Sequence, residues 1–170
     1  IKTININCND IATILEKVYN LDQNMRQNEN DLDESIDKQN LVTVVSIIEK
    51  CGMPTLNEVT QKQMNAIWLV FQHSDNTNRK KYLPQLIKAA ENGDLNKSKV
   101  ATMQDRILVF DGKSQIYGTQ VFSKIGGENE LWKLENPEYV DQRRKKVGLD
   151  PLADYLKKWN IKFDIRQKEQ

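Results

Sequence analysis

The sequence predicts a mainly α fold (α+β), a single helical domain over residues 1–170 with a small β-hairpin near residues 114–135. Apolar residues recur at helical spacing through most of the first 110 positions, and capping residues, glycines and prolines separate these stretches. The period changes to alternation only after Gly112. A chain of this length suggests one domain and can bury a core of its own.

The N-terminal residues 1–9 are expected to form a short strand or an arm, because Ile4, Ile6 and Cys8 alternate with polar residues. A helix follows Asp10, a candidate N-cap. It should run to about Asn28, where the acidic, polar stretch 28–37 predicts a break or the start of the next helix.

Four more helices are predicted before residue 112. Thr55 and Glu58 fit the capping-box pattern and should open the second of these four. Glycines just beyond helical stretches predict where the helices end. The four helices are expected from Ser35 to about Gly52, from the Thr55 box to about His73, from Arg79 to Asn92 and from Lys97 to Phe110.

The later part of the chain combines a hairpin with two short helices. Alternation over residues 114–123 predicts a strand, and Gly126-Gly127 predicts a turn into residues 130–135. Asn136-Pro137 and Asp150-Pro151 each pair an N-cap with a proline at the first helical position. The helices and the C-terminal tail are expected at 137–147, 151–159 and 160–170.

Charge and composition exclude several classes of partner. Lysine and arginine number 25 and aspartate and glutamate 24, which gives a net charge of +1. We therefore expect no nucleic-acid binding, and the basic run 143–146 is expected to be a solvated face. No apolar run approaches the ~20 residues of a membrane helix, so no membrane span is predicted. The oligomeric state is left open.

The two cysteines, Cys8 and Cys51, predict neither a disulfide framework nor a metal site. Two buried thiols are favoured over a single bridge, and no metal or cofactor is predicted. The chain begins at Ile1 instead of methionine, which favours an exported protein, periplasmic or derived from a lipoprotein, over a cytoplasmic one. Abundant Asn, Lys and Ile suggest a bacterial source.

His73 is the only histidine and stands at the end of the most apolar helix. A helix C-terminus favours imidazolium, so the ring is a candidate acid or base. Asp75 is close enough in sequence to orient it, and Gln72 is a candidate ligand contact. The alternative is a histidine that caps the last carbonyls of its helix.

Asp105 and Arg106 lie within an apolar helix and point about 100° apart, so each should meet a different partner. A general acid or base beside an anion-binding arginine is one interpretation. The other is an internal salt bridge that ties helices together.

Residues 115–120, QIYGTQ, are the most unusual segment. On a strand, Gln115, Tyr117 and Thr119 would share one face, and Gly118 and Gln120 the other. A phenol beside two amides suits recognition of a polar small molecule, and a central glycine admits close approach to the backbone. The alternative is a hairpin whose amides satisfy nearby carbonyls. Arg143 could reach inward to the same site.

Several segments, taken together and in order, resemble an uncharacterised bacterial domain family of unknown function, marked by a QHAD-like segment, a DR pair and a YGTQ segment. The resemblance runs from about Asp22 to Tyr155, with Ser74 where the family often has alanine and Cys51-Gly-Met where it often has an aromatic residue, glycine and tryptophan. It implies no activity. The segments are DQNMR (22–26), CGMPT (51–55), WLVFQHSD (68–75), LPQL (83–86), DRILVFDGKSQIYGTQ (105–120) and VDQRRKKVGLDPLADY (140–155).

Two functions fit these residues, and whether the protein is an enzyme stays open. In the first, a polar pocket binds a polar or anionic small molecule, with His73, Asp105, Arg106 and Tyr117 as catalytic candidates; His73 and the Asp105-Arg106 pair should then lie close together. In the second, the protein is a non-enzymatic interaction module of the immunity or adaptor type. Contiguous exposed aromatic residues would favour the second.

Overall fold

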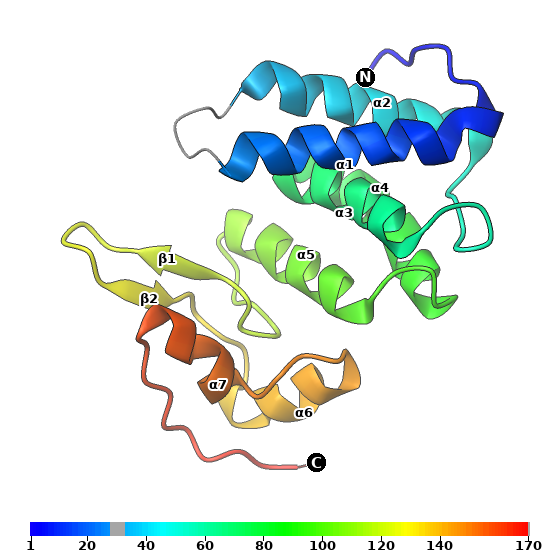
Figure 1. The fold of residues 1–170 in the computed structure, drawn as a ribbon. Coiled ribbons are helices and arrows are strands. Elements are labelled where there is room, and N and C mark those ends of the chain that lie inside the picture. The colour runs from blue at the N-terminus through cyan, green and yellow to red at the C-terminus, as the bar shows by residue number, and fades with distance from the viewer. Residues whose placement is uncertain (28–32, 170) are drawn as a thin grey trace. The chain divides into compact units, whose positions relative to one another are not determined.

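The computed structural model describes residues 1–27 and 33–169 and confirms the mainly α fold class, with a two-stranded antiparallel hairpin (Figure 1). The chain forms two compact units, Ile1–Leu95 and Asn96–Gln170. The single domain expected from the sequence stays a prediction. Among the described residues, no helix is both long and apolar enough to cross a membrane.

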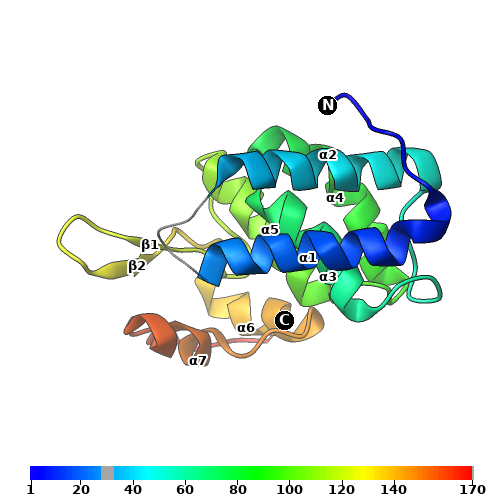
Figure 2. The ribbon, with the colours of Figure 1, turned by 45° about the horizontal axis from the view of Figure 1, so that its top comes forward.

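The first unit is a helical bundle. Helix α1 packs against both α2 and α3, α2 also packs against α3, and α4 packs against α3 (Figure 2). Phe71 and Tyr82 stack in its core with ring centroids 4.5 Å apart. Its elements are η1 (Cys8–Asp10), α1 (Ile11–Gln27), α2 (Glu34–Cys51), α3 (Gln61–His73) and α4 (Asn76–Glu91). The predicted break at 28–37 lies partly outside the described residues.

The N-terminal residues form an arm and no strand. The Ile4 N–H donates to Ser46 Oγ of α2 at 3.0 Å. The arm is therefore held by a helix side chain and has no neighbouring strand to pair with in the described structure. The sequence had favoured two buried free thiols, and this prediction is wrong. Cys8 and Cys51 form a disulfide. It joins the turn before α1 to the last residue of α2.

The predicted capping box is displaced by five residues. Thr60 caps α3: its hydroxyl accepts from the Gln63 N–H, and the Gln63 side chain accepts from the Thr60 N–H. Glu58 instead accepts from the N–H and hydroxyl of Thr55 within a turn before the helix. Both segments match the S/T-x-x-E/Q pattern, so the pattern alone did not locate the helix start.

The second unit places the hairpin and the short helices around a small apolar cluster. Val140, Leu152 and Leu156 are fully buried there. Val121 pairs with Leu131 across the hairpin, whose turn points away from α6 in both views (Figures 1 and 2). The elements are α5 (Lys97–Phe110), β1 (Val121–Ser123), β2 (Asn129–Leu131), η2 (Pro137–Tyr139), α6 (Val140–Lys146), α7 (Leu152–Leu156) and η3 (Lys157–Trp159).

The strand predicted from residue 114 begins only at Val121. Residues 115–120 form a loop, with one isolated bridge between Gln115 and Leu134. The alternating faces expected for this segment are therefore wrong. The reason is the buried carboxylate of Asp105, which accepts hydrogen bonds from backbone N–H groups of the loop.

Candidate functional site

His73 is the last residue of α3, and its ring belongs to a polar cluster in the first unit. Its Nδ1 atom lies 2.9 Å from Asp22 Oδ1 of α1. The side chain of Asp22 is only 1% exposed, whereas that of His73 is 22% exposed. A buried carboxylate thus fixes one ring nitrogen of a partly exposed imidazole, an arrangement that orients the other nitrogen for proton transfer.

Asp22 is itself held in place, because the Gln23 amide donates to its Oδ2 at 2.8 Å and leaves Oδ1 for the cluster. Burial alone would raise the pKa of Asp22. The hydrogen bonds and charges of His73, Gln23 and Arg26 outweigh burial and lower this pKa below its usual value of 3.8. Asp22 is therefore an anion at neutral pH.

Arg26 and Asp37 complete the cluster. Arg26 Nε donates to His73 Nδ1 at 2.9 Å and to Asp22 Oδ1 at 3.3 Å, and its Nη2 donates to Asp37 Oδ1 at 2.6 Å. Nδ1 therefore faces an obligate donor, Arg26, and an obligate acceptor, Asp22. When Nδ1 carries a lone pair, it accepts from Arg26. When Nδ1 carries the proton, it donates to Asp22. The cluster therefore accommodates both tautomers of the ring.

The lowered pKa of Asp22 predicts a loss of stability in acid. Ionised Asp22 stabilises the fold above its usual, unfolded pKa of 3.8, and this contribution disappears as pH falls through the lower folded value. Asp22→Asn should reduce the free energy of unfolding at pH 7 by about 1.5–3 kcal/mol. Urea denaturation should show the difference from wild type shrinking below pH ~4. A difference that stays constant to pH 2, or an equal loss in the exposed Glu34→Gln, would contradict this.

The other candidates around His73 have different places. Asp75, expected to orient the ring, instead caps α4: its two carboxylate oxygens accept from the backbone and side-chain N–H groups of Asn78, 2.9 and 2.6 Å away. Asp22 does the orienting. Gln72 is 5% exposed, and its Oε1 is a buried atom without a hydrogen-bond partner in the described structure.

In the second unit, Asp105 organises the loop 115–120. Its carboxylate is fully buried and accepts from the N–H groups of Ile116, Tyr117 and Thr119 at 2.7–3.0 Å. The Thr119 hydroxyl donates to it at 2.9 Å as well. The loop N–H groups donate to this carboxylate and not to a neighbouring strand. The loop is therefore folded around the negative charge of Asp105.

Two arginines donate hydrogen bonds to backbone carbonyls of the same loop. Arg143 Nε donates to the Ile116 carbonyl at 2.9 Å, and Arg144 Nη1 donates to the Tyr117 carbonyl at 2.6 Å. Arg144 is 1% exposed, and its guanidinium lies over the Tyr155 ring. The loop is therefore fixed from both sides by buried or partly buried charges.

The loop amides serve the loop itself. The Gln115 side chain donates to the Gln120 and Trp132 carbonyls and accepts from the Gln120 N–H at 2.9–3.0 Å. The Gln120 side chain donates to Thr119 Oγ1 at 3.1 Å. Burial and the charge of Asp105 raise the pKa of Tyr117, so its phenol stays protonated at neutral pH.

Gly118 has a φ of +72°, and a Cβ there would lie 2.8 Å from Leu152 Cδ1. Gly148 has a similar φ of +75° with nothing within 4 Å of its Cβ position. We expect Gly118→Ala to lower the free energy of unfolding by about 1–3 kcal/mol more than Gly148→Ala, because only the first adds overpacking to backbone strain. Urea denaturation of both variants measures this, and equal losses would refute the packing argument.

The predicted site residues fall into two units. Gln72, His73 and Asp75 belong to the first, and Asp105, Arg106, Arg143 and loop 115–120 belong to the second. Arg106 lies near Phe110, its guanidinium carbon 5.8 Å from the ring centroid. The single pocket expected from His73 and the Asp105-Arg106 pair stays a prediction.

The sequence reasoning did not select Asp22, Arg26 or Asp37. Asp22 nevertheless gave a signal, because it lies four residues after Val18 and three before Met25, on the buried face of α1. A carboxylate on an apolar face needs a partner, and Arg26 at i+4 supplies one. Within the part of the chain that the structure describes, Asp22, Asp37 and His73 each offer one ligand atom, and these atoms lie within 4.8 Å of one another. This spacing is close enough to suggest a metal ion.

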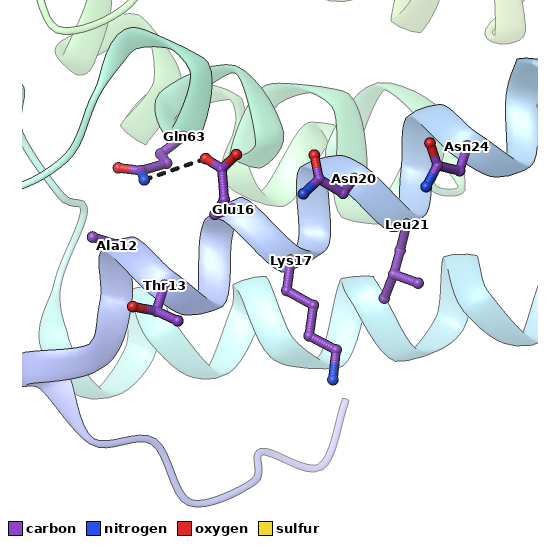
Figure 3. Close-up of a pocket in the computed structure, with 8 residues that line it drawn as sticks. All are labelled: Ala12, Thr13, Glu16, Lys17, Asn20, Leu21, Asn24 and Gln63. Atoms are coloured by element: carbon purple, nitrogen blue, oxygen red, sulfur yellow. Dashed lines mark hydrogen bonds between the residues drawn. The ribbon is translucent and has the colours of Figure 1, made fainter.

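A hollow of about 510 Å³ lies elsewhere on the first unit, over α1 (Figure 3). Gln63 Nε2 donates to Glu16 Oε2 at 3.4 Å on one side of it, whereas Lys17 and Leu21 extend to another side of the helix. None of the predicted site residues lines it. Because its polar groups diverge, the His73 cluster is the better candidate.

Comparison with known proteins gives a family but no activity. A family model described as a family of unknown function, DUF6624, matches residues 20–168. The chain belongs to this family. The match confirms the expected resemblance to an uncharacterised family and contains every predicted site residue. No curated protein and no solved structure shows a significant match.

Proposed function

We propose that this DUF6624 protein binds a polar small molecule at the His73 cluster and that His73 acts on it as an acid or a base. The observation that carries the proposal is the buried Asp22 carboxylate on Nδ1 of a partly exposed ring. This contact leaves Nε2 as the ring nitrogen for a ligand. Arg26 and Asp37 supply opposite charges beside it.

Two buried amides add support. Asn40 is 2% exposed with Nδ2 unpartnered, and Gln72 is 5% exposed with Oε1 unpartnered in the described structure. Asn40 lies three residues after Asp37 on α2 and so shares its face, whereas Gln72, next to His73 on α3, points about 100° away from it. Buried polar atoms need hydrogen-bond partners, which a bound polar molecule or water would provide.

In the second unit, Asp105, Gln115, Thr119 and Arg143 make hydrogen bonds within the loop network, which favours a positioning role for them. Gly118 belongs to the same loop and gives it a backbone φ of +72°. Tyr117, which this network holds by its backbone, is the residue of the loop best suited to contact a ligand. The Gln120 amide donates to Thr119 within the same loop, and Arg106, whose guanidinium lies near the Phe110 ring, stays a candidate ligand contact.

A thermal-shift screen of polar and anionic metabolites tests the proposal. A compound at about 100 times its Kd should raise the melting temperature by roughly 5–10 °C. His73→Asn, which keeps an amide near the Nδ1 position, should lose this shift, while Trp159→Ala should keep it. The proposal fails if no compound shifts the wild type, or if every hit shifts His73→Asn equally.

A second candidate, a non-enzymatic interaction module, is favoured by exposed apolar residues in the second unit. Phe122 and Trp159 are 38% and 40% exposed, and Ile125 at the hairpin turn is fully exposed. Phe122 also meets Trp132 edge to face at 5.8 Å. If the metabolite screen fails, these residues are the ones to substitute in a search for a protein partner.

A further inference from the structure

We infer that Asp22, Asp37 and His73 form a binding site for a divalent transition-metal ion, which exchanges with the guanidinium of Arg26. The inference deepens the proposed function, because it concerns the same cluster and names a ligand class for it. It starts from geometry: one ligand atom from each of the three residues lies within 4.8 Å of the others. Asp22 Oδ1 and His73 Nδ1 are 2.9 Å apart.

That separation suits a shared metal ion. Metal–ligand bonds to imidazole and carboxylate are about 2.0–2.2 Å long, so neighbouring ligand atoms at right angles lie about 3 Å apart. Asp37 is the more adaptable ligand, because its side chain is 35% exposed whereas that of Asp22 is 1% exposed. Gln23 fixes Asp22 through Oδ2 and leaves Oδ1 to coordinate, as outer hydrogen bonds do in metal sites.

Arg26 shows that the three groups already converge on one cation. Its guanidinium nitrogens lie 2.9 Å from His73 Nδ1, 3.3 Å from Asp22 Oδ1 and 2.6 Å from Asp37 Oδ1. With a neutral imidazole, two carboxylates and one guanidinium leave a net charge of −1. A divalent ion in place of the guanidinium would bring this charge to zero.

Arg26 is able to leave. Its side chain is 24% exposed, and it stands next to the last residue of α1. Its contacts in the described structure are with the cluster itself. When it turns outward, the Nδ1 lone pair and both Oδ1 atoms become available to a metal ion.

The ligand set indicates which ion. One imidazole nitrogen with two carboxylate oxygens suits Zn²⁺, Mn²⁺, Fe²⁺ or Co²⁺, whereas Mg²⁺ and Ca²⁺ prefer oxygen alone. Three protein ligands leave a coordination position for water or substrate, which is the pattern of catalytic sites. With the ion on Nδ1, the ring proton is on Nε2, so His73 would donate a hydrogen bond or proton to the polar ligand of the proposed function while the ion supplies Lewis acidity.

Titration of the tag-free 170-residue chain with Zn²⁺ and Co²⁺ at pH 7.5, by calorimetry and Co²⁺ absorption, tests the inference. Wild type should bind one ion. Asp37→Asn and His73→Asn should weaken binding at least tenfold. Glu34→Gln, which removes a charge from the same helix outside the cluster, should bind like wild type. Arg26→Met, which removes the competing cation, should bind at least tenfold more tightly.

Circular dichroism should confirm that each variant is folded, and Asp37→Asn, at a partly exposed position, keeps the test valid if Arg26→Met does not fold. The inference is overturned if wild type binds neither ion below millimolar concentration, or if Glu34→Gln weakens binding as much as Asp37→Asn does. A metabolite shift that depends on His73 but needs no metal would leave the proposed function standing and overturn the metal site alone.

Discussion

Asp105→Ala is expected to lower the free energy of unfolding by at least about 3 kcal/mol, because three backbone N–H groups of loop 115–120 lose their acceptor. Each unpartnered buried donor costs about 1–3 kcal/mol, and the buried charge of Arg144 loses a nearby anion. Asp105→Asn should cost less, since one amide oxygen still accepts. Asp105 is fully buried, so water cannot replace the carboxylate without a rearrangement.

Urea denaturation followed by circular dichroism measures this loss. Asp154→Ala is the matched control. Asp154 is 57% exposed in the same unit and pairs with Lys157 at the surface, so its loss should stay within about 0.5 kcal/mol. If Asp105→Ala unfolds at the same urea concentration as this control, the loop does not depend on the carboxylate, and a catalytic role for Asp105 regains weight.

Reduction of the Cys8–Cys51 disulfide is expected to lower the free energy of unfolding by about 4 kcal/mol. The bridge closes a loop with a sequence separation of 43 residues and so restricts the unfolded chain. It also ties the arm before α1 to the end of α2. Denaturation with and without a reductant measures the effect.

The double variant Cys8→Ser/Cys51→Ser controls for the reductant itself. It should match the reduced wild type and show no further response to reductant. Alkylation before reduction should label no cysteine in the wild type. Two labelled thiols in the native protein would contradict the bridge. Because disulfides persist in oxidising compartments, this result bears on the expected export, which stays a prediction.

The helices were predictable because their signals are local. The helix at Lys97–Phe110 was predicted with the bounds that the structure shows, since its apolar stripe and the following Gly112 are both visible in the sequence. The start of α3 was not, because two capping-box patterns stand five residues apart. Only the fold decides which of them precedes the buried face.

The loop at 115–120 was mistaken for a strand because its residue types alternate as in a strand. Its conformation depends instead on Asp105, at least ten residues earlier, and on Arg144, more than twenty residues later. Such partners are brought to the loop by the tertiary fold of the second unit. Periodicity, which reports only neighbours along the chain, cannot reveal them.

For the same reason, the sequence revealed only part of the candidate site. His73 stood out as the only histidine, but its orienting carboxylate is 51 residues away in sequence, at Asp22. Asp75 was the nearest acidic residue and was chosen on that basis. Its carboxylate instead caps α4, a strong local role for aspartate.

The central claim is that His73 forms the centre of a ligand site, and NMR of its imidazole nitrogens tests it most directly. The chain has one histidine, so Nδ1 and Nε2 give the only two ring signals. We predict that a stabilising metabolite, or Zn²⁺, shifts at least one of these signals in the wild type and does so less in Asp37→Asn. If both signals stay in place with every compound that stabilises the chain and with Zn²⁺, the cluster is a structural ion-pair network and the claim is wrong.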